Sequence, residues 1–427
     1  MHTTSQPAFV LDEPSFSEVV AKAAGNFILP LLIVCASFLL VSYAPDLPDF
    51  FVVLKIYAPY FMLGAGLMIA LAFKRGRALF AVLSLLIAYI CFRVFFAESQ
   101  PAEFVSNTVY AVLCILVPLN LAILTWVRER GALNSYGWRR LAALLIAVGL
   151  TAAVIFGEYK GVTEFLHRPL LADVVISGSP IPQSGIVAML VALVAAISGA
   201  VARGGVIEAA LAVSIVAFAA ACNVVATSDM FMWFTAAGLI VTVAVLQDSH
   251  RMAFSDELTG LPGRRALNES LMALNHNYTI AMLDVDHFKA FNDKWGHDIG
   301  DQVLKLVASR IQRVGGGGRA YRYGGEEFTI VFPGKRLLEV MSRLDALRKS
   351  INEYKLRIRS ATRPRQPGEP GARPAADGMR DDEWISVTVS AGVAEKNDRL
   401  ATPEEVIQSA DQALYRAKES GRNRVSR

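Results

Sequence analysis

Four acidic residues and a lysine in the C-terminal half of the chain are of the types that bind a metal ion and phosphate groups. Asp284 and Asp286 stand two positions apart, Glu326 and Glu327 are adjacent, and Lys289 follows the first pair. Carboxylate oxygens suit Mg²⁺, which takes one or two carboxylates together with waters and phosphate oxygens. Any one of these acids alone is more typical of a solvated surface residue. Together they indicate metal-assisted phosphoryl or nucleotidyl transfer.

Strands and a turn must bring the two acidic pairs together. The alternating run 278–285 predicts a buried strand that ends at the first pair. Two further β-like runs, 319–323 and 328–332, flank Gly324-Gly325, and a Gly-Gly pair between such runs is typical of a tight hairpin. The two glutamates are expected at the tip of that hairpin. The stretch 300–313 has apolar residues at helical spacing and is expected to be a helix.

The same residues belong to a longer pattern that resembles a known family. Roughly 251–427 is similar to the GGDEF domain, the catalytic domain of diguanylate cyclases, in the variant whose signature reads Gly-Gly-Glu-Glu-Phe, here 324–328. The supporting segments, in the family's order, are Asp256–Leu261, Asp284–Lys289, Asn292-Asp293, Gly296-His297, Gly300-Asp301, Val389–Ala394, Ala410–Lys418 and Gly421–Asn423. The resemblance implies that 248–427 is an α/β (α+β) domain with a central, mostly antiparallel sheet flanked by helices.

The resemblance also implies an activity, the condensation of two GTP molecules into cyclic di-GMP with release of two pyrophosphates. The family's positions for Mg²⁺, with Mn²⁺ as a possible substitute, fall on Asp284, the main-chain carbonyl of Val285, Glu326 and Glu327. Glu326 and Glu327 also match the catalytic carboxylates. The substrate-binding positions fall on Phe288, Lys289, Asn292, His297, Asp301, Lys418 and Arg422.

Two of the substrate-binding positions match the pair that reads guanine in the family, Asn292 and Asp301. An ionised Asp accepts hydrogen bonds from N1–H and the exocyclic amine of guanine, donors that adenine lacks in that arrangement. The resemblance implies that Lys289, Lys418 and Arg422 bind the phosphate groups. GTP is therefore the expected substrate.

The product ring needs two GTP molecules and one domain holds one, so the working enzyme is expected to be a homodimer. The part of the chain before the domain is expected to regulate it. One alternative is a GGDEF domain without turnover that senses a nucleotide or scaffolds a partner. A second alternative is a transporter with a cytoplasmic regulator, for which the sequence shows neither paired buried charges nor matching interrupted spans.

The N-terminal part, 1–247, is expected to be an all-α membrane bundle of about eight spans and a sensor or anchor. Apolar runs long enough to cross a bilayer lie near 26–43, 50–73, 78–96, 104–127, 141–157, 185–202, 206–226 and 230–246. Three ionisable residues in these runs, Lys55, Arg93 and Glu208, stand near span ends, from which they are expected to reach the interface. The lipid bilayer is thus an expected partner.

The charges of the connections predict an orientation. Basic residues gather at 74–77, 128–140 and 203, in alternate connections, whereas the other connections hold mostly acids. By the positive-inside rule both termini are cytoplasmic. A multi-pass protein of the bacterial cytoplasmic (inner) membrane, with its catalytic domain in the cytoplasm, is expected.

The overall composition excludes other classes of function. Of the 80 charged residues, 54 lie in 248–427, and the net charge is only +4. No dense basic face for nucleic acid is expected. The four cysteines, Cys35, Cys91, Cys114 and Cys222, lie in apolar stretches without a Cys-x-x-Cys pair, so they are expected to be small buried residues rather than metal ligands or disulfides.

Two segments depart from the family's pattern. The family commonly has a product-binding Arg-x-x-Asp motif just before its signature, but Gly315 and Gly318 stand at those positions here. Little product inhibition through that site is therefore expected. The segment 357–383 is rich in Arg, Pro and Gly and is expected to be a disordered surface insertion, with a regulatory or lipid-headgroup contact as the alternative.

Overall fold

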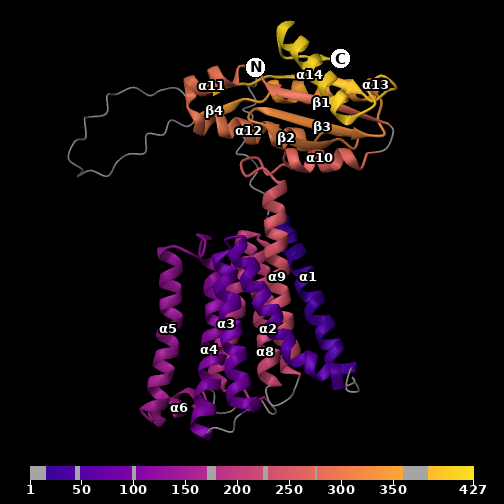
Figure 1. Ribbon diagram of the computed structural model, residues 1–427. Helices are drawn as coiled ribbons and strands as arrows, with labels where there is room; N and C mark the ends of the chain where they lie inside the picture. The colour runs from indigo at the N-terminus through magenta and orange to yellow at the C-terminus, as the bar shows by residue number, and fades with distance from the viewer. Residues whose placement is uncertain are drawn as a thin grey trace, which may run out of the picture. The chain divides into compact units, whose positions relative to one another are not determined.

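The structure is a computed structural model that describes residues 16–43, 49–98, 102–170, 179–224, 229–274, 277–358 and 383–427. Its internal contacts divide the chain into two compact units, Met1–His250 and Arg251–Arg427. The first unit is helical and the second contains a sheet between helices (Figure 1). This two-part fold class, a helical membrane-type part followed by a mixed domain, agrees with the expectation from the sequence.

Each of the eight predicted spans coincides with a helix among the described residues. The helices are α1 (Phe16–Tyr43), α2 (Asp49–Ala72), α3 (Gly76–Phe92) with the π-helical η1 (Arg93–Glu98), α4 (Glu103–Trp126), α5 (Ser135–Phe156), α7 (Gln183–Arg203), α8 (Val206–Asn223) and α9 (Met230–Phe254). Seven of them are long and apolar enough to cross a membrane, and α2 contributes a shorter apolar segment, Ile56–Ala72. A short helix that was not expected, α6 (Lys160–His167), follows α5.

A buried ion pair inside the helical unit corrects the expectation that the bundle contains no paired buried charges. Arg77 Nη1 lies 2.5 Å from Glu208 Oε1, and both side chains are less than one-tenth exposed. Arg77 Nε also lies 3.4 Å from Glu129 Oε2, and the Gly76 N–H donates to Glu129. Glu208 is therefore buried against Arg77. It occupies the first turn of α8, where the helix dipole also favours a carboxylate.

The other two ionisable residues of the predicted spans have different surroundings. The guanidinium group of Arg93 lies over the ring of Phe231, 5.7 Å from its centroid. The side chain of Lys55 lies outside the described residues. The ion pair of Arg77 lies at the ends of α3 and α8 rather than in the middle of a span.

A second ion pair holds the last helix of the unit. α9 extends beyond residue 246, where its span was expected to end, and Asp248 Oδ2 lies 2.9 Å from Arg75 Nη2. Arg75 precedes the first residue of α3 and Arg77 follows it, so the start of α3 contacts both α8 and α9 through ion pairs. The start of α3 therefore links the beginning of α8 to the C-terminal part of α9.

The cysteines are free thiols and do not all share one environment. Cys114 and Cys222 are buried with their sulfur atoms 3.8 Å apart, and Cys91 is half-buried. Cys35 is exposed, so the expectation that it is buried is wrong. Hydropathy marked α1 as a span, but only 6% of its apolar window is buried within the unit.

The second unit contains a five-stranded sheet of order β2-β3-β1-β6-β7. Its strands are β1 (Tyr278–Val285), β2 (Arg319–Gly324), β3 (Glu327–Pro333), β6 (Val389–Glu395) and β7 (Val425–Ser426). β1 pairs antiparallel with β3 and β6, β2 pairs antiparallel with β3, and only β7 is parallel to its neighbour. The predicted mostly antiparallel sheet is therefore confirmed.

Helices cover both faces of this sheet, which explains why β1 is buried along its whole length. Alternate residues of β1, Ala281, Leu283 and Val285, pack with α12 (His297–Gln312) and α13 (Leu337–Asn352). Tyr278, Ile280 and Met282 pack on the other face with α10 (Arg264–Met272) and α14 (Pro403–Glu419). By the same alternation Asp284 belongs to the face that α14 covers.

The region around the predicted insertion differs in detail from the expectation. Residues 359–382 lie outside the described part of the chain, so the insertion itself is not described. Its two ends pair as antiparallel strands, β4 (Leu356–Ile358) and β5 (Glu383–Ile385). β5 ends at Ile385, and the next strand, β6, begins at Val389.

Candidate active site

Two of the predicted acidic residues face each other across neighbouring strands. In the register of β1 and β3, Asp284 lies directly opposite Glu327. Side chains in such a pair have Cβ atoms about 4.5–5.5 Å apart on the same face of the sheet. The Val285 N–H also lies 3.4 Å from the main-chain oxygen of Glu326. The pairing of β1 with β3 therefore brings the two acid-bearing segments together.

The hairpin differs from the expected one in the place of its second glutamate. Glu327 is the first residue of β3 and pairs with Gly324, so only Gly325 and Glu326 form the turn. Glu326 is half-buried beside the strand end. The two glutamates therefore approach Asp284 from different elements, one from a strand and one from a turn.

A lysine of α14 contacts the buried carboxylate of Asp284. Asp284 is only 5% exposed, and Lys418 Nζ lies 2.8 Å from its Oδ2. Close packing of α14 on β6 makes this reach possible, because a Cβ added to Gly392 would lie 2.0 Å from the main-chain nitrogen of Leu414. A larger residue at 392 would displace the helix that supplies Lys418.

The pKa values of all three carboxylates are raised. Burial is the main cause for Asp284, whose pKa is raised even though Lys418 opposes the shift. Burial also raises the pKa of Glu326 and of Glu327, and the negative charge of Asp284 raises both further. Carboxylates that repel one another in a partly buried place are stabilised by a cation. This electrostatic arrangement fits a divalent metal ion.

The number of protein ligands also fits Mg²⁺. Among the described residues, no three His, Cys, Asp or Glu side chains converge closely enough to hold a metal ion by themselves. Mg²⁺ does not need such a group, because it usually takes one or two carboxylates and fills its octahedron with waters and substrate phosphates. Asp284, Glu326 and the main chain at Val285 are therefore candidate ligands for an ion shared with a phosphorylated substrate.

Asp286, which the sequence grouped with the metal-binding acids, has a structural role. Its Oδ1 accepts from the hydroxyl group of Ser390, and its Oδ2 accepts from the hydroxyl group of Thr388 and from the Asn423 N–H, at 2.7–3.0 Å. Its own N–H donates to the Thr388 oxygen. Asp286 therefore links β1 to the strand β6 and to the C-terminal segment that contains Arg422, and its oxygens are already used.

The two predicted guanine-reading residues lie on neighbouring helices. Asn292 belongs to α11 (Phe288–Trp295), and Asp301 is exposed on α12. A Cβ on Gly300 would lie 1.9 Å from Asn292 Oδ1, so only glycine at 300 permits this approach. That oxygen is buried and accepts no hydrogen bond from the described residues. A buried acceptor without a protein donor needs a partner from elsewhere, either a water or a ligand.

The remaining predicted substrate-binding residues differ in how closely they approach the end of β1. Phe288 begins α11 and is buried, and His287 before it has a left-handed backbone (φ 58°), so the first N–H groups of α11 start directly after the strand. Such N–H groups suit an anion. Arg422 is near enough to Asp284 for its charge to oppose the rise in the pKa of that acid. Lys289 and His297 are exposed, and neither contacts the acids among the described residues.

An arginine that the sequence did not single out holds the turn of the hairpin. Arg322 donates through Nε and Nη2 to the Gly325 oxygen, at 3.1 and 2.6 Å, and its Nη1 lies 2.7 Å from Asp256 Oδ1. Burial acts to raise the pKa of Asp256, but hydrogen bonds from Thr259 and Arg322 outweigh it and lower the pKa. The ionised Asp256 therefore holds Arg322 in place. Arg322 in turn holds Gly325, the residue before Glu326.

The C-terminal unit is similar to known proteins. Residues 253–368 and 377–424 match the family described as diguanylate cyclase, GGDEF domain. The C-terminal unit is a GGDEF domain. Diguanylate cyclase VdcA of Vibrio cholerae is 38% identical to the chain over 180 residues, which are 40% of this chain and 46% of that protein. Response regulator PleD of Caulobacter vibrioides is 35% identical over 188 residues, 42% of this chain and 37% of that protein.

Each of these matches covers less than half of this chain. The chain spans less than half the length of these two curated relatives. Among solved structures, the GGDEF domain of DgcB from Caulobacter crescentus in complex with c-di-GMP is 35% identical. The match covers 41% of this chain and 92% of that chain, with a TM-score of 0.34.

The GGDEF domain also has a pocket of about 560 Å³ beside Glu327, between α10 and α14. Arg264, Glu404 and Asp411 line it. After burial and Asp284, the charge of Asp411 raises the pKa of Glu327 further, whereas Arg264 lowers it. The sequence alone did not indicate these neighbours, since they are separated from Glu327 by at least sixty residues of chain.

We expect the Arg322→Lys variant of the GGDEF domain to lower the rate of nucleotide turnover about tenfold to a hundredfold, because lysine keeps the charge but loses the forked contact that places the turn. Steady-state turnover of GTP by the full chain measures this. Arg319→Lys, the same change at an exposed position of β2, is the matched control. Equal rates for the two variants would show that the fork does not position Glu326.

Proposed function

We propose that the chain is a membrane-bound diguanylate cyclase that condenses two GTP molecules into cyclic di-GMP and two pyrophosphates. The observation that supports the proposal best is the register of β1 and β3, which sets Asp284 opposite Glu327 and beside the turn of Glu326. Relatives of the domain named as diguanylate cyclases point to the same reaction. The buried oxygen of Asn292 provides a place for a nucleobase donor.

A divalent ion, Mg²⁺ or Mn²⁺, would be held by Asp284, the Val285 carbonyl and Glu326, with Glu327 beside it. When bound, such an ion neutralises charge that develops at the α-phosphate and lowers the pKa of the attacking hydroxyl group. GGDEF diguanylate cyclases generally need a divalent metal. Lys418, which contacts Asp284 in this structure, would then be free to contact a phosphate oxygen.

The side chains of the domain bind and orient the nucleotide in this proposal. Asp301 accepts from guanine N1–H and the exocyclic amine, and Asn292 Oδ1 accepts a further donor of the base. The N–H groups at the start of α11 and the Arg422 guanidinium contact the phosphates. Glu327 takes the proton from the ribose 3′-hydroxyl group, and its raised pKa makes the carboxylate a better base than an ordinary surface Glu.

One domain holds one nucleotide, so we propose that two copies of the chain face each other during the reaction. Each 3′-hydroxyl group then attacks the α-phosphate in the other copy. The apolar helices of the N-terminal unit anchor both copies in a bilayer, in the orientation that places basic connections and the GGDEF domain in the cytoplasm. The bacterial inner membrane is the proposed location.

The full chain in lipid nanodiscs tests this function directly. Purified protein is mixed with Mg²⁺ and labelled GTP, and the products are separated by chromatography. Release of one cyclic di-GMP for every two pyrophosphates supports the proposal. Saturable GTP binding without any cyclic product contradicts turnover and leaves the nucleotide-sensing or scaffold alternative.

The N-terminal unit is proposed to regulate the reaction through α9. This helix runs without interruption to Phe254, and Arg75 holds it through Asp248. We expect a flexible Gly/Ser segment inserted after Asp248 to make the cyclase rate independent of any condition that changes it in the unmodified chain, because a flexible chain does not transmit helix movement. An equal length of helix-forming sequence is the control. Regulation that survives the flexible insertion would contradict this role of α9.

The glycine-rich loop before the hairpin leads to a prediction about the product. Gly315 and Gly318 offer no charge for a nucleotide, and the Arg343 guanidinium group packs against Gly315 and Gly316 instead. We expect added cyclic di-GMP to leave the initial rate of the full chain unchanged, measured by pyrophosphate release. Arg343→Gln should behave like the wild type. Strong inhibition that a substitution in 315–318 removes would contradict the expectation.

A further inference from the structure

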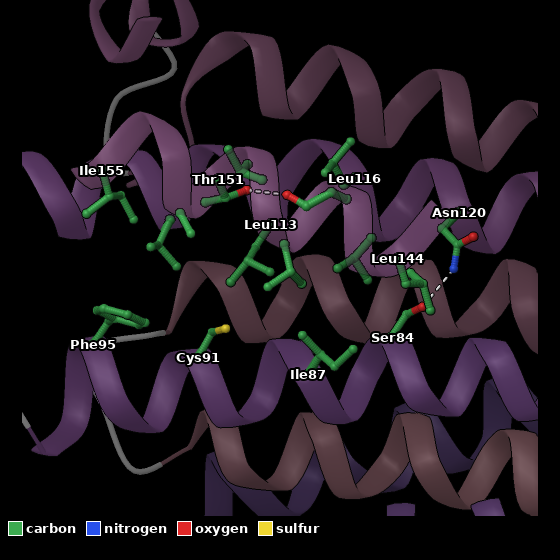
Figure 2. Close-up of a pocket in the computed structure, with 16 residues that line it drawn as sticks. Ser84, Ile87, Cys91, Phe95, Leu113, Leu116, Asn120, Leu144, Thr151 and Ile155 are labelled. Atoms are coloured by element: carbon green, nitrogen blue, oxygen red, sulfur yellow. Dashed lines mark hydrogen bonds between the residues drawn. The ribbon is translucent and has the colours of Figure 1, made fainter. Parts of the chain in front are cut away.

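A slender apolar cavity of about 210 Å³ lies between α3, α4 and α5 of the helical unit. Figure 2 shows Phe95 and Ile155 at one end of it and Ser84 and Asn120 at the other. Along α5 its lining runs from Leu144 to Ile155, which is about 16 Å of helix. A volume this small spread over that length is narrow in cross-section, and its long axis follows the helices.

The chemistry of the lining selects an apolar occupant with one polar group. Aliphatic side chains dominate the walls. The hydroxyl group of Thr151 donates a hydrogen bond to the Ala147 oxygen, 2.8 Å away, so it is not available to an occupant. The polar end is a pair in which Asn120 Nδ2 donates to Ser84 Oγ at 2.7 Å. Apolar cavities of such size remain dry and take up hydrocarbon.

The helix that closes the cavity is packed loosely. Gly137 is the only buried residue of α5, whereas two-thirds of the apolar window of α4 is buried. Figure 1 shows α5 at the edge of the bundle. The opposite wall includes Phe95 from the π-helical segment η1, and such segments occur frequently at functional sites. A chain can therefore enter when α5 moves aside.

We propose that this cavity binds one unbranched acyl chain, from a free fatty acid or from a membrane lipid, with its carbonyl or carboxyl end at Asn120. The chain lies parallel to the helices, as acyl chains of a bilayer do. Leaving the bilayer brings no hydrophobic gain, because lipid tails are as apolar as the lining. The gain comes from van der Waals contacts that an empty cavity forfeits and from the hydrogen bond at Asn120.

Two neighbouring alanines of α5 provide a matched pair of variants. Ala152 lines the cavity, whereas Ala153 is exposed and does not line it. Ala152→Phe fills the cavity, and Ala153→Phe adds the same side chain to the outer face of the helix. We expect cis-parinaric acid, an unbranched fluorescent fatty acid, to bind saturably to the full chain, and Ala152→Phe to weaken that binding at least about tenfold while Ala153→Phe does not.

The lipid of the nanodisc distinguishes the two sources of the chain. In nanodiscs of methyl-branched phospholipids, which fit a narrow cavity poorly, the fatty acid binds without competition. If straight-chain phospholipids weaken that binding, a lipid tail is an occupant of the cavity. If they leave it unchanged, the free fatty acid is preferred. Both results support an acyl-chain site.

Cys91 gives a second measurement, made in a Cys35→Ser background because the exposed thiol of Cys35 would react as well. Its thiol lines the cavity, as Figure 2 shows, so a bound chain should slow its reaction with a maleimide over the same concentration range in which the fatty acid binds. Two results would overturn the proposal. One is identical, non-saturable uptake of the fatty acid by the wild type and Ala152→Phe, and the other is a Cys91 labelling rate that does not change with fatty acid concentration. None of these readouts uses cyclic di-GMP formation, so they stand apart from the proposed function.

Discussion

The Asp284→Asn variant is expected to form cyclic di-GMP at least about a hundredfold more slowly than the wild type, since a metal ion supplies several kcal/mol at the transition state. Asn has no charge to hold the ion. The change also leaves Lys418, now 2.8 Å from a neutral amide, as an unpaired positive charge where the ion would sit. Glu327→Gln is expected to show a similar loss, because it removes the proposed base.

Steady-state rates of the full chain at saturating GTP and over a range of Mg²⁺ concentrations measure these losses. Asp398→Asn is the matched control, because Asp398 is exposed in the connection between β6 and α14. Its rate should equal that of the wild type. A rate for Asp284→Asn within a few-fold of the control would mean that this carboxylate does not take part in the reaction.

Replacement of Asp301 by Ala is expected to erase part of the selectivity for guanine. Hydrogen bonds to a charged group contribute about 1.5–3 kcal/mol, so kcat/KM for GTP should fall about tenfold to a hundredfold. Inosine triphosphate lacks the exocyclic amine of guanine. The wild type should therefore prefer GTP to inosine triphosphate, and Asp301→Ala should treat the two more nearly alike.

The ratio of kcat/KM for the two nucleotides is the measurement for this prediction. Asp298→Ala serves as the control, since Asp298 is an exposed residue in the first turn of the same helix. It should keep the wild-type ratio. A variant at Asp301 that loses activity while keeping its preference for GTP would show that another residue reads the base.

The elements that position the acids followed from local sequence. Alternation over 278–285 predicted β1, and the Gly-Gly pair predicted the hairpin, because both signals act over a few residues. Hydropathy predicted the helices of the first unit in the same way. The partners of Asp286 could not be predicted, since Thr388 and Ser390 stand about a hundred residues away and meet it only through the pairing of β1 with β6.

The missed features of the helical unit have a related physical cause. Arg77 was counted as a basic residue of a connection, but α3 begins at Gly76 and turns Arg77 toward Glu208, 131 residues later in the chain. A charge pattern read along the sequence assigns a side of the membrane and not a partner. The cavity beside α5 was also invisible, because apolar periodicity is the same for a helix that packs tightly and one that does not.

The binding of Mn²⁺ to the full chain together with a non-hydrolysable GTP analogue, measured by electron paramagnetic resonance, tests most directly whether Asp284 and Glu326 share a metal ion. Mn²⁺ should bind saturably to the wild type and to Asp398→Asn. Asp284→Asn and Glu326→Gln should each weaken binding by at least about tenfold, since even residues that only support metal ligands contribute that much. Unchanged Mn²⁺ affinity in both variants would contradict the proposed metal site and the reaction that depends on it.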